Sequence, residues 1–299
     1  MKILITGANG FLGYYLVKQL LLTDFDIIAS SKGECRLPFE DEKKFQYVSM
    51  DFTDPFAVHD VFEQYQPEII IHAGAMSKPD ECEENQWQCY ITNVEGTLNL
   101  LMNAETYKSH ILFISTDFVF DGETGMYAEN DKPAPVNFYG KTKWEGEEAV
   151  MAYSADWTIV RTVLVYGKPV TGRQNILSMV KQKLEDLEEY FVVHDQVRTP
   201  TYVEDLADAI ISLVKKKAKG IFHISGDEKL TPYEMACKTA DFLKMNNSVI
   251  KPVATADFPQ SAKRPLKTGF NIDKARKEIN YSPVSFEEGL KRTFNDSEY

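Results

Sequence analysis

The chain of 299 residues lacks features that mark several large classes of protein. No hydrophobic run approaches the about 20 residues that a membrane-spanning helix needs, and the first residues carry one lysine and no small-residue cleavage site of a secretion signal. Positive charge is scarce, since 33 Lys and Arg residues stand against 45 Asp and Glu residues, for a net charge of −12. Neither nucleic acid nor an anionic membrane is therefore expected as a partner.

Cysteine and histidine also lack the spacing of a structural site. The five histidines are dispersed, and His72 and His223 fall in apolar segments, where a hydrogen-bonded core histidine is commoner than a metal ligand. No CxxC pair occurs among the four cysteines, which are Cys35, Cys82, Cys89 and Cys237. We therefore predict reduced thiols, no metal site and a cytoplasmic location. Any anionic ligand has to be held by a local pocket.

Apolar and amphipathic segments alternate through the first half of the chain. Strands are predicted at 3–6, 26–30, 45–50, 68–73, 111–115 and 157–162, and helices at 11–22, 57–64, 93–106 and 138–152. This alternation is typical of a parallel sheet, and apolar runs such as Ile69-Ile70-Ile71 indicate strands buried on both faces. The predicted fold class is α/β, with a Rossmann-type doubly wound parallel sheet.

Beyond Gly167 the alternation becomes less regular. Helices are predicted at 176–187, 203–216, 231–243 and 286–291, and strands at 190–193 and 221–224. A chain of this length exceeds what one small core uses, so a second lobe is expected. We predict a dinucleotide-binding domain at 1–165, with a return segment at about 197–225, and an interwoven substrate lobe at 166–196 and 226–299.

A glycine-rich turn follows the first predicted strand, with the sequence Thr6-Gly7-Ala8-Asn9-Gly10-Phe11-Leu12-Gly13. Gly7 suits the bend, Gly10 a close approach of backbone to a pyrophosphate, and Gly13 tight packing of helix on strand. The free N–H groups at the start of the helix attract an anion. A tight turn without a ligand is the alternative for this motif alone. The predicted dinucleotide contacts here are Gly7, Asn9, Gly10, Phe11, Leu12 and Gly13.

A phenol and an ammonium lie four residues apart in Tyr139-Gly140-Lys141-Thr142-Lys143, which places them on one face of a helix. Tyr139 can protonate the oxygen of a carbonyl while hydride reaches its carbon, and Lys143 can stabilise the charged form of the phenol. Thr116 ends the fifth strand, at the sheet edge where such folds bind ligands, and can position the carbonyl. Thr116, Tyr139 and Lys143 are the predicted catalytic residues. A solvated helix pair is the alternative.

The end of the second strand indicates which dinucleotide is preferred. An NAD enzyme places an acidic residue there for the ribose 2′-hydroxyl, but this chain has Ser30, Ser31 and Lys32. Two hydroxyls and an ammonium suit a 2′-phosphate, so NADP(H) is the predicted cofactor, with NAD(H) possible. An ordinary polar turn without a selective role is the alternative.

Several motifs resemble the RmlD family of extended short-chain reductases, the dTDP-4-dehydrorhamnose reductases. They are Ser-Thr-Asp-Phe-Val-Phe-Asp-Gly at 115–122, the Tyr139 to Lys143 motif, Arg161-Thr162, Val165-Tyr166-Gly167, Asp195-Gln196 with Pro200-Thr201, and Phe222-His223-Ile224-Ser225-Gly226. The resemblance implies reduction of the 4-keto group of a nucleotide-linked deoxysugar, with the Thr, Tyr and Lys triad. It also implies that Asp51 and Phe52 line the adenine, that Ala73-Gly74-Ala75 passes under the nicotinamide half, and that Tyr139 and Lys143 contact the cofactor.

Departures from the family pattern concern the substrate side. Val163-Leu164 stand where rhamnose reductases usually have Ser-Trp, Arg198 replaces a usual Gly, and Phe118 replaces a usual Tyr. The predicted substrate contacts are Asp117, Asn175, Arg198 and Arg264, with the two arginines as a diphosphate clamp or, alternatively, as surface ion pairs.

Some segments are also similar to the methionine adenosyltransferase β subunit, an NADP-binding regulatory partner, for instance Pro133-Ala134-Pro135 before the Tyr139 motif. Two functions therefore stay open: a nucleotide-sugar reductase, or a related epimerase, that binds a small-molecule substrate and forms a possible homodimer, and a non-catalytic regulatory subunit.

Overall fold

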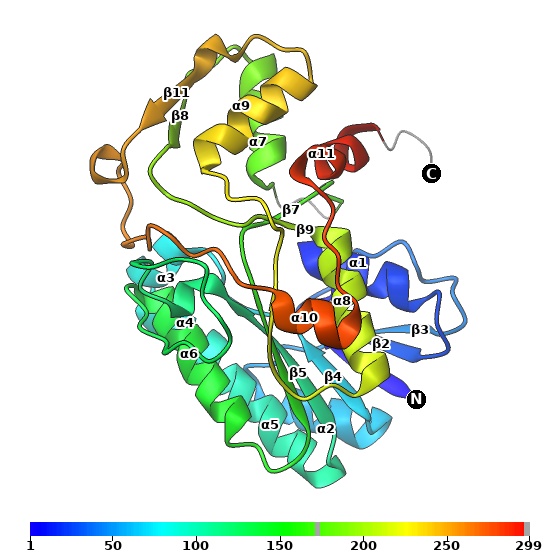
Figure 1. The fold of residues 1–299 in the computed structure, drawn as a ribbon. Helices are drawn as coiled ribbons and strands as arrows, with labels where there is room; N and C mark the ends of the chain where they lie inside the picture. Colours follow the sequence, from blue (N-terminus) through cyan, green and yellow to red (C-terminus); the bar gives the residue numbers. More distant parts are fainter. Residues whose placement is uncertain (171–173, 296–299) are drawn as a thin grey trace.

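A seven-stranded parallel sheet forms the centre of the computed structural model, which describes residues 1–170 and 174–295. The strand order is β10-β6-β5-β4-β1-β2-β3 (Figure 1). The strands are β1 (Lys2–Thr6), β2 (Asp26–Ser31), β3 (Phe45–Ser49), β4 (Ile69–His72), β5 (His110–Thr116), β6 (Trp157–Thr162) and β10 (Gly220–Ile224). All neighbouring pairs run parallel, so the predicted doubly wound α/β fold is confirmed.

Helices cover both faces of this sheet (Figure 1). Parallel strands need crossover connections, most of these connections contain a helix, and the helices pack on one face or the other. One face carries α1 (Phe11–Leu20), α8 (Val203–Lys216) and α10 (Asp273–Ile279). The other carries α2 (Pro55–Tyr65), α5 (Gly96–Tyr107) and α6 (Phe138–Met151). Two apolar layers result, and the strands between them are buried on both sides, as in β4, where all four residues are buried.

The strand order reverses beside β1. The chain runs outward from β1 to β2 and β3, and then crosses back to β4 on the other side of β1. Adjacent crossovers that leave in opposite directions open a crevice at the carboxyl ends of the strands, which is where such sheets bind ligands. The glycine-rich turn follows β1 and the Ala73-Gly74-Ala75 turn follows β4, so both lie at this crevice.

A broken helical run between β4 and α5 was not predicted. It comprises α3 (Pro79–Glu84), α4 (Gln86–Tyr90) and the π-helical turn η1 (Ile91–Glu95), which continues into α5. Asn85, with φ −125° and ψ 58°, separates the first two helices. The sequence predicted only one helix at 93–106, because α3 and α4 are too short and polar to show a clear apolar period.

The smaller lobe is built around two packed helices, α7 (Ile176–Glu185) and α9 (Pro232–Phe242). Beside them β8 (Tyr190–Val193) pairs with β11 (Ile250–Val253), and α11 (Phe286–Asn295) packs against α9. Thr231 and Glu234 form a capping box at the start of α9. The remaining elements are β7 (Val165–Tyr166) paired with β9 (Thr201–Tyr202), and the short turns η2 (Asp117–Val119), η3 (Asn247–Val249) and η4 (Thr255–Asp257).

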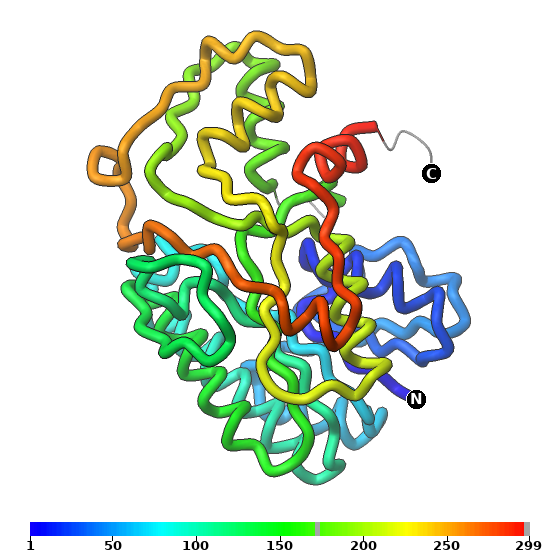
Figure 2. Tube along the Cα trace, in the orientation of Figure 1, coloured from blue at the N-terminus to red at the C-terminus, as the bar shows by residue number. Residues whose placement is uncertain are grey.

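The chain crosses between the two lobes several times (Figure 2). Residues 261–268, which we name the strap, lead from the smaller lobe past α3 towards α10. Phe270, Ile272 and Tyr281, from the segment assigned to the smaller lobe, are buried in the apolar layer that α1 and α8 form on the main sheet. The lobe boundaries stay a prediction. No helix in the described ranges is long and apolar enough to span a membrane.

Candidate active site

The glycine-rich turn brings backbone close to backbone. Gly7 has φ +70°, and a Cβ there would lie 2.7 Å from the Cα of Gly74. A Cβ on Gly13 would lie 2.4 Å from the carbonyl oxygen of Gly7, so any side chain would push α1 away from the turn. Gly10 is the N-cap of α1, and no side chain caps this helix start. The first turn of α1 therefore offers backbone N–H groups at the crevice, which suits a pyrophosphate.

Asn9 ties this turn to the loop after β2. Its Nδ2 donates to the carbonyl oxygen of Glu34 (2.9 Å), its Oδ1 accepts from the backbone N–H of Arg36 (3.0 Å), and its own N–H donates to Ser31 Oγ (2.9 Å). The loop therefore stands beside the crevice and carries two exposed cations, Lys32 and Arg36. Arg36 was missed in the sequence, although it lies only four residues beyond Lys32.

Ser30 lies differently from its two neighbours. Its side chain is fully buried, and its hydroxyl has no hydrogen-bond partner within the part of the chain that the structure describes. Of the three residues predicted to bind the 2′-phosphate, Ser31 and Lys32 lie at the start of this loop. Contacts of all three with the cofactor stay predictions.

A pocket of about 410 Å³ opens next to this loop. The Lys32 ammonium lies 2.8 Å from the Asp51 carboxylate at its mouth. Burial alone would raise the pKa of Asp51, but hydrogen bonds from Lys32 and Thr53 lower it, so the carboxylate is ionised. The lining residues are Lys32, Met50, Asp51, Phe52, Thr53, Gln88, Ile91 and Thr92. Three of them were predicted for the adenosine half, whereas the last three come from the unpredicted α4 and η1 segment.

The predicted catalytic side chains gather at the carboxyl end of β5. Thr116 is the last residue of β5, and Tyr139 and Lys143 lie one turn apart at the start of α6. Asn137 caps α6 by accepting from Gly140 N (2.8 Å). A Cβ on Gly140 would lie 2.1 Å from the carbonyl oxygen of Phe118, so the helix packs tightly on the turn that follows Thr116. The three side chains are all less than 10% exposed.

Lys143 lies in an apolar environment. Its Nζ is 3.8 Å from the centre of the Phe113 ring, and the residue is 2% exposed. Burial lowers the pKa of Lys143 from 10.5 to about 7, and the charges of Glu147 and Cys89 partly oppose this effect. The apolar surroundings therefore weaken the charged form of Lys143, and the nearby Glu147 carboxylate supports it.

Asn93 supports α6 from the π-helical turn. Its Nδ2 donates to Thr142 Oγ1 and to Met76 O (each 3.0 Å), and its Oδ1 accepts from Met76 N (2.9 Å). Thr142 lies between Tyr139 and Lys143, so Asn93 connects their helix to the loop after β4. The sequence offered one signal, a polar residue at a buried position of a predicted helix.

The predicted substrate contacts have partners within the chain. Asn175 caps α7, accepting from Leu177 N (3.0 Å) and donating to Gly167 O (2.7 Å). Arg264 on the strap makes two hydrogen bonds to the Asp80 carboxylate, of 2.9 and 2.6 Å. Arg198 and Asp117 are buried against each other, with Nε 3.8 Å from Oδ2. Their contacts with a substrate stay predictions. Among residues 1–170 and 174–295, no three His, Cys, Asp or Glu side chains are grouped to hold a metal.

Comparison with known proteins places these features in a family. The sequence profile of the RmlD substrate binding domain matches residues 1–299. The methionine adenosyltransferase 2 subunit beta of Pongo abelii is 31% identical over 280 residues, which cover 91% of this chain and 81% of that protein.

Two solved structures superpose on nearly the whole molecule. The dTDP-4-dehydrorhamnose reductase of Clostridium acetobutylicum has a TM-score of 0.87 and 32% identity, with 99% of each chain covered. That of Bacillus anthracis, in complex with NADP, has a TM-score of 0.86 and 31% identity, again with 99% of each chain covered. The match along the full chain and the shared α/β architecture agree, and the protein belongs to the RmlD substrate binding domain family of extended short-chain reductases.

Proposed function

We propose that this protein is an NADPH-dependent reductase that acts on the 4-keto group of a nucleotide-linked deoxysugar. The observation that carries the proposal is the grouping of Thr116, Tyr139 and Lys143 at the carboxyl edge of the sheet, the same edge that carries the glycine-rich turn. The NADP bound to the Bacillus anthracis relative and the reductase activity named for both solved relatives support it.

The residues at the crevice fit a dinucleotide. The close approach of Gly7 and Gly74 leaves room for no side chain, and the start of α1 offers free N–H groups for a pyrophosphate. The pocket at Asp51 and Phe52 accepts the adenosine half. When bound, the reduced nicotinamide supplies a hydride.

The chain's own side chains then handle the substrate oxygen. Tyr139 donates its phenolic proton to the carbonyl oxygen as negative charge develops there. Lys143 favours the phenolate that remains and offers its N–H groups to a ribose. The Thr116 hydroxyl orients the carbonyl. Burial of all three side chains strengthens these interactions, because the competing water is excluded.

NADPH is expected to bind more tightly than NADH by at least ~1 kcal/mol, the scale of one charge-assisted hydrogen bond. Lys32 and Arg36 present the cations, so the double variant Lys32→Ala/Arg36→Ala should lose most of this preference. Calorimetric titration of both cofactors measures it. Lys44→Ala is the matched control, since Lys44 is an exposed lysine paired with Asp24. Equal affinities in the unaltered protein would remove the phosphate-pocket assignment.

Turnover is expected with dTDP-4-dehydro-6-deoxy-L-mannose or a close 4-keto relative. The assay measures the loss of NADPH absorbance with each member of a panel of sugar nucleotides. Arg264→Ala should raise KM by more than it lowers kcat, since the loss of a ground-state contact acts on binding. The Arg264 guanidinium has to leave the Asp80 carboxylate before it can bind the diphosphate. Asp80→Asn weakens this ion pair and should therefore lower KM. An unchanged KM in both variants would contradict the clamp.

A second candidate function follows from the 31% identity to the methionine adenosyltransferase 2 subunit beta. As a regulatory subunit, the protein would bind NADPH but reduce nothing in the panel. Co-purification from its native source would then bring down a stoichiometric partner, and a methionine adenosyltransferase is the first one to look for.

A further inference from the structure

A buried ion pair joins the end of β5 to the segment between β8 and β9. Asp117 follows Thr116 directly, and Arg198 lies on the segment between β8 and β9, where it pairs with Leu230 through both backbone hydrogen bonds (2.9 Å each). Asp117 is 2% exposed and Arg198 is 3% exposed. A charge this deeply buried is costly unless it is paired and hydrogen-bonded, so the contacts of both groups are informative.

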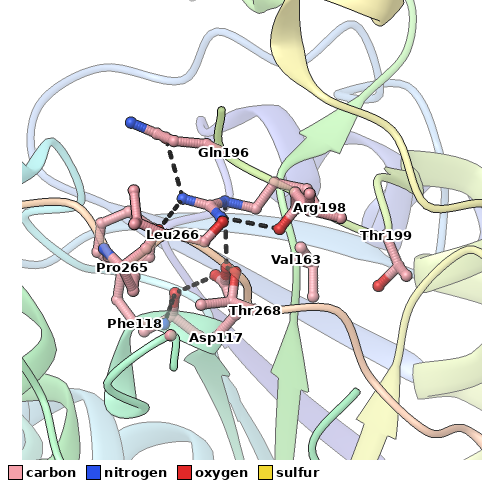
Figure 3. Close-up of polar contacts among 12 residues, drawn as sticks. Asp117, Phe118, Val163, Gln196, Arg198, Thr199, Pro265, Leu266 and Thr268 are labelled. Atoms are coloured by element: carbon pink, nitrogen blue, oxygen red, sulfur yellow. Dashed lines mark hydrogen bonds and ion pairs between the residues drawn. The ribbon is translucent and has the colours of Figure 1, made fainter. Parts of the chain in front are cut away.

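The Arg198 guanidinium donates hydrogen bonds to the strap and to residues of its own segment (Figure 3). Nη2 donates to Pro265 O (2.7 Å) and Gln196 Oε1 (3.0 Å), and Nη1 donates to Leu266 O (3.1 Å) and Val197 O (2.9 Å). Nε faces Asp117. Of the five N–H groups of a guanidinium, those on Nη1 and Nη2 make four hydrogen bonds within the protein, and Nε lies 3.8 Å from the Asp117 carboxylate. Direct binding of a diphosphate would require these bonds to open.

The Asp117 carboxylate connects the strap to the catalytic threonine. Its Oδ1 accepts from Thr116 Oγ1 (3.0 Å), and its Oδ2 accepts from Thr268 Oγ1 on the strap. Burial raises the pKa of Asp117, and the Arg198 charge opposes this. The Thr116 side chain is therefore held by a carboxylate that is itself held by the strap and by Arg198, and its single hydroxyl hydrogen has to turn from Asp117 to reach a substrate carbonyl.

A second route leads to the catalytic tyrosine. The Arg198 guanidinium carbon lies 5.9 Å from the centre of the Phe118 ring. That ring packs edge-on against Tyr139, with centroids 5.7 Å apart. The same cation thus contacts a neighbour of Thr116, which is Asp117, and a neighbour of Tyr139, which is Phe118.

We propose that Asp117 and Arg198 are positioning residues that couple the strap to Thr116 and Tyr139, so that the orientation of the reacting groups depends on a seated strap. The kinetic part of this inference rests on the proposed reductase function. Because the strap also carries Arg264, a ligand that engages the strap would set the catalytic hydroxyls at the same time.

The first test is hydrogen exchange, which needs no substrate. Arg198→Gln is expected to speed exchange in peptides covering 116–120 and 262–268 together, by about tenfold or more, because both lose a shared support. Arg276→Gln is the matched control, since Arg276 forms an exposed ion pair with Asp227, and it should leave both peptides unchanged. Faster exchange of the strap alone would overturn the coupling.

The second test is steady-state kinetics on the substrate found in the panel. Arg198→Gln and Asp117→Asn should lower kcat on the order of 10- to 100-fold, the scale of a small misplacement of reacting groups, while KM changes by less than about threefold. Arg198→Lys should recover part of the loss by restoring the charge. A raised KM with an intact kcat would instead make Arg198 a direct substrate contact and overturn the positioning role.

The coupling can still be tested if the protein has no reductase activity or if Arg198→Gln does not fold. If the unaltered protein reduces nothing, the proposed function fails, and the exchange experiment still decides the coupling. If Arg198→Gln does not fold, the double variant Asp117→Asn/Arg198→Gln leaves no unpaired buried charge, and the same joint increase in exchange is expected. Unchanged exchange in that double variant would reject the coupling.

Discussion

Replacing Tyr139 with phenylalanine is expected to lower reductase turnover by roughly 10²- to 10⁴-fold, the usual contribution of a positioned acid. The change removes one hydroxyl from a side chain that is 9% exposed, and the ring can keep its edge contact with Phe118. NADPH affinity should change little, since Lys143 and the glycine-rich turn are untouched. Initial rates and calorimetric titration of the same preparation measure both quantities.

Tyr190→Phe provides the control for this experiment, because Tyr190 lies on β8 in the smaller lobe, away from the end of β5. It removes the same atom and should leave turnover within about threefold of the unaltered protein, as expected for a residue outside the catalytic constellation. Wild-type turnover by Tyr139→Phe would mean that another group supplies the proton. The assignment of Thr116, Tyr139 and Lys143 as the catalytic set would then fall.

Replacing Arg161 with methionine is expected to lower the free energy of unfolding by roughly 3–5 kcal/mol, because it leaves a buried carboxylate without its partner. Glu147 is 0% exposed and Arg161 is 1% exposed. Arg161 Nη2 lies 2.6 Å from Glu147 Oε2, and Nε lies 3.0 Å from Oε1. Denaturant unfolding with and without the substitution measures the loss.

Two further variants separate the unpaired charge from the lost packing. Glu147→Gln/Arg161→Met removes both charges and should cost clearly less than the single change. Lys219→Met breaks an exposed pair with Asp156 (2.6 Å) and should cost at most about 1 kcal/mol. If Arg161→Met were as mild as Lys219→Met, the buried pair would not be a main support of the helix that carries Lys143.

The sheet and its order of elements could be predicted because the information is local. Each strand is a short apolar run, and each helix of the first half except the α3 to η1 run has an apolar face that can be counted along the chain. The glycine-rich turn and the Tyr139 motif have fixed spacings, so a dinucleotide site and a catalytic pair could be predicted from them. The broken helix before α5 was missed because a π-turn has no distinctive local pattern.

The parts that escaped prediction depend on partners distant in sequence. Arg198 is a charged residue that composition alone would leave at the surface, and only the fold brings it to Asp117 and to the carbonyl oxygens of Pro265 and Leu266. Arg36 gains its place from a hydrogen bond to Asn9, 27 residues earlier. Distances of this kind cannot be obtained from periodicity.

The order of the strands also sets when each part of the molecule can be completed during synthesis. The strands β1 to β5 have all been synthesised once residue 116 has been added, whereas the edge strand β10 and the core residues Phe270 and Tyr281 come much later. A domain generally folds as a unit during synthesis. The main domain can therefore be completed only after Phe270 and Tyr281 have been made, and by then the strap that reaches Thr116 through Asp117 has also been synthesised. The predicted dinucleotide crevice and the support of Thr116 are thus expected to form together, late in synthesis.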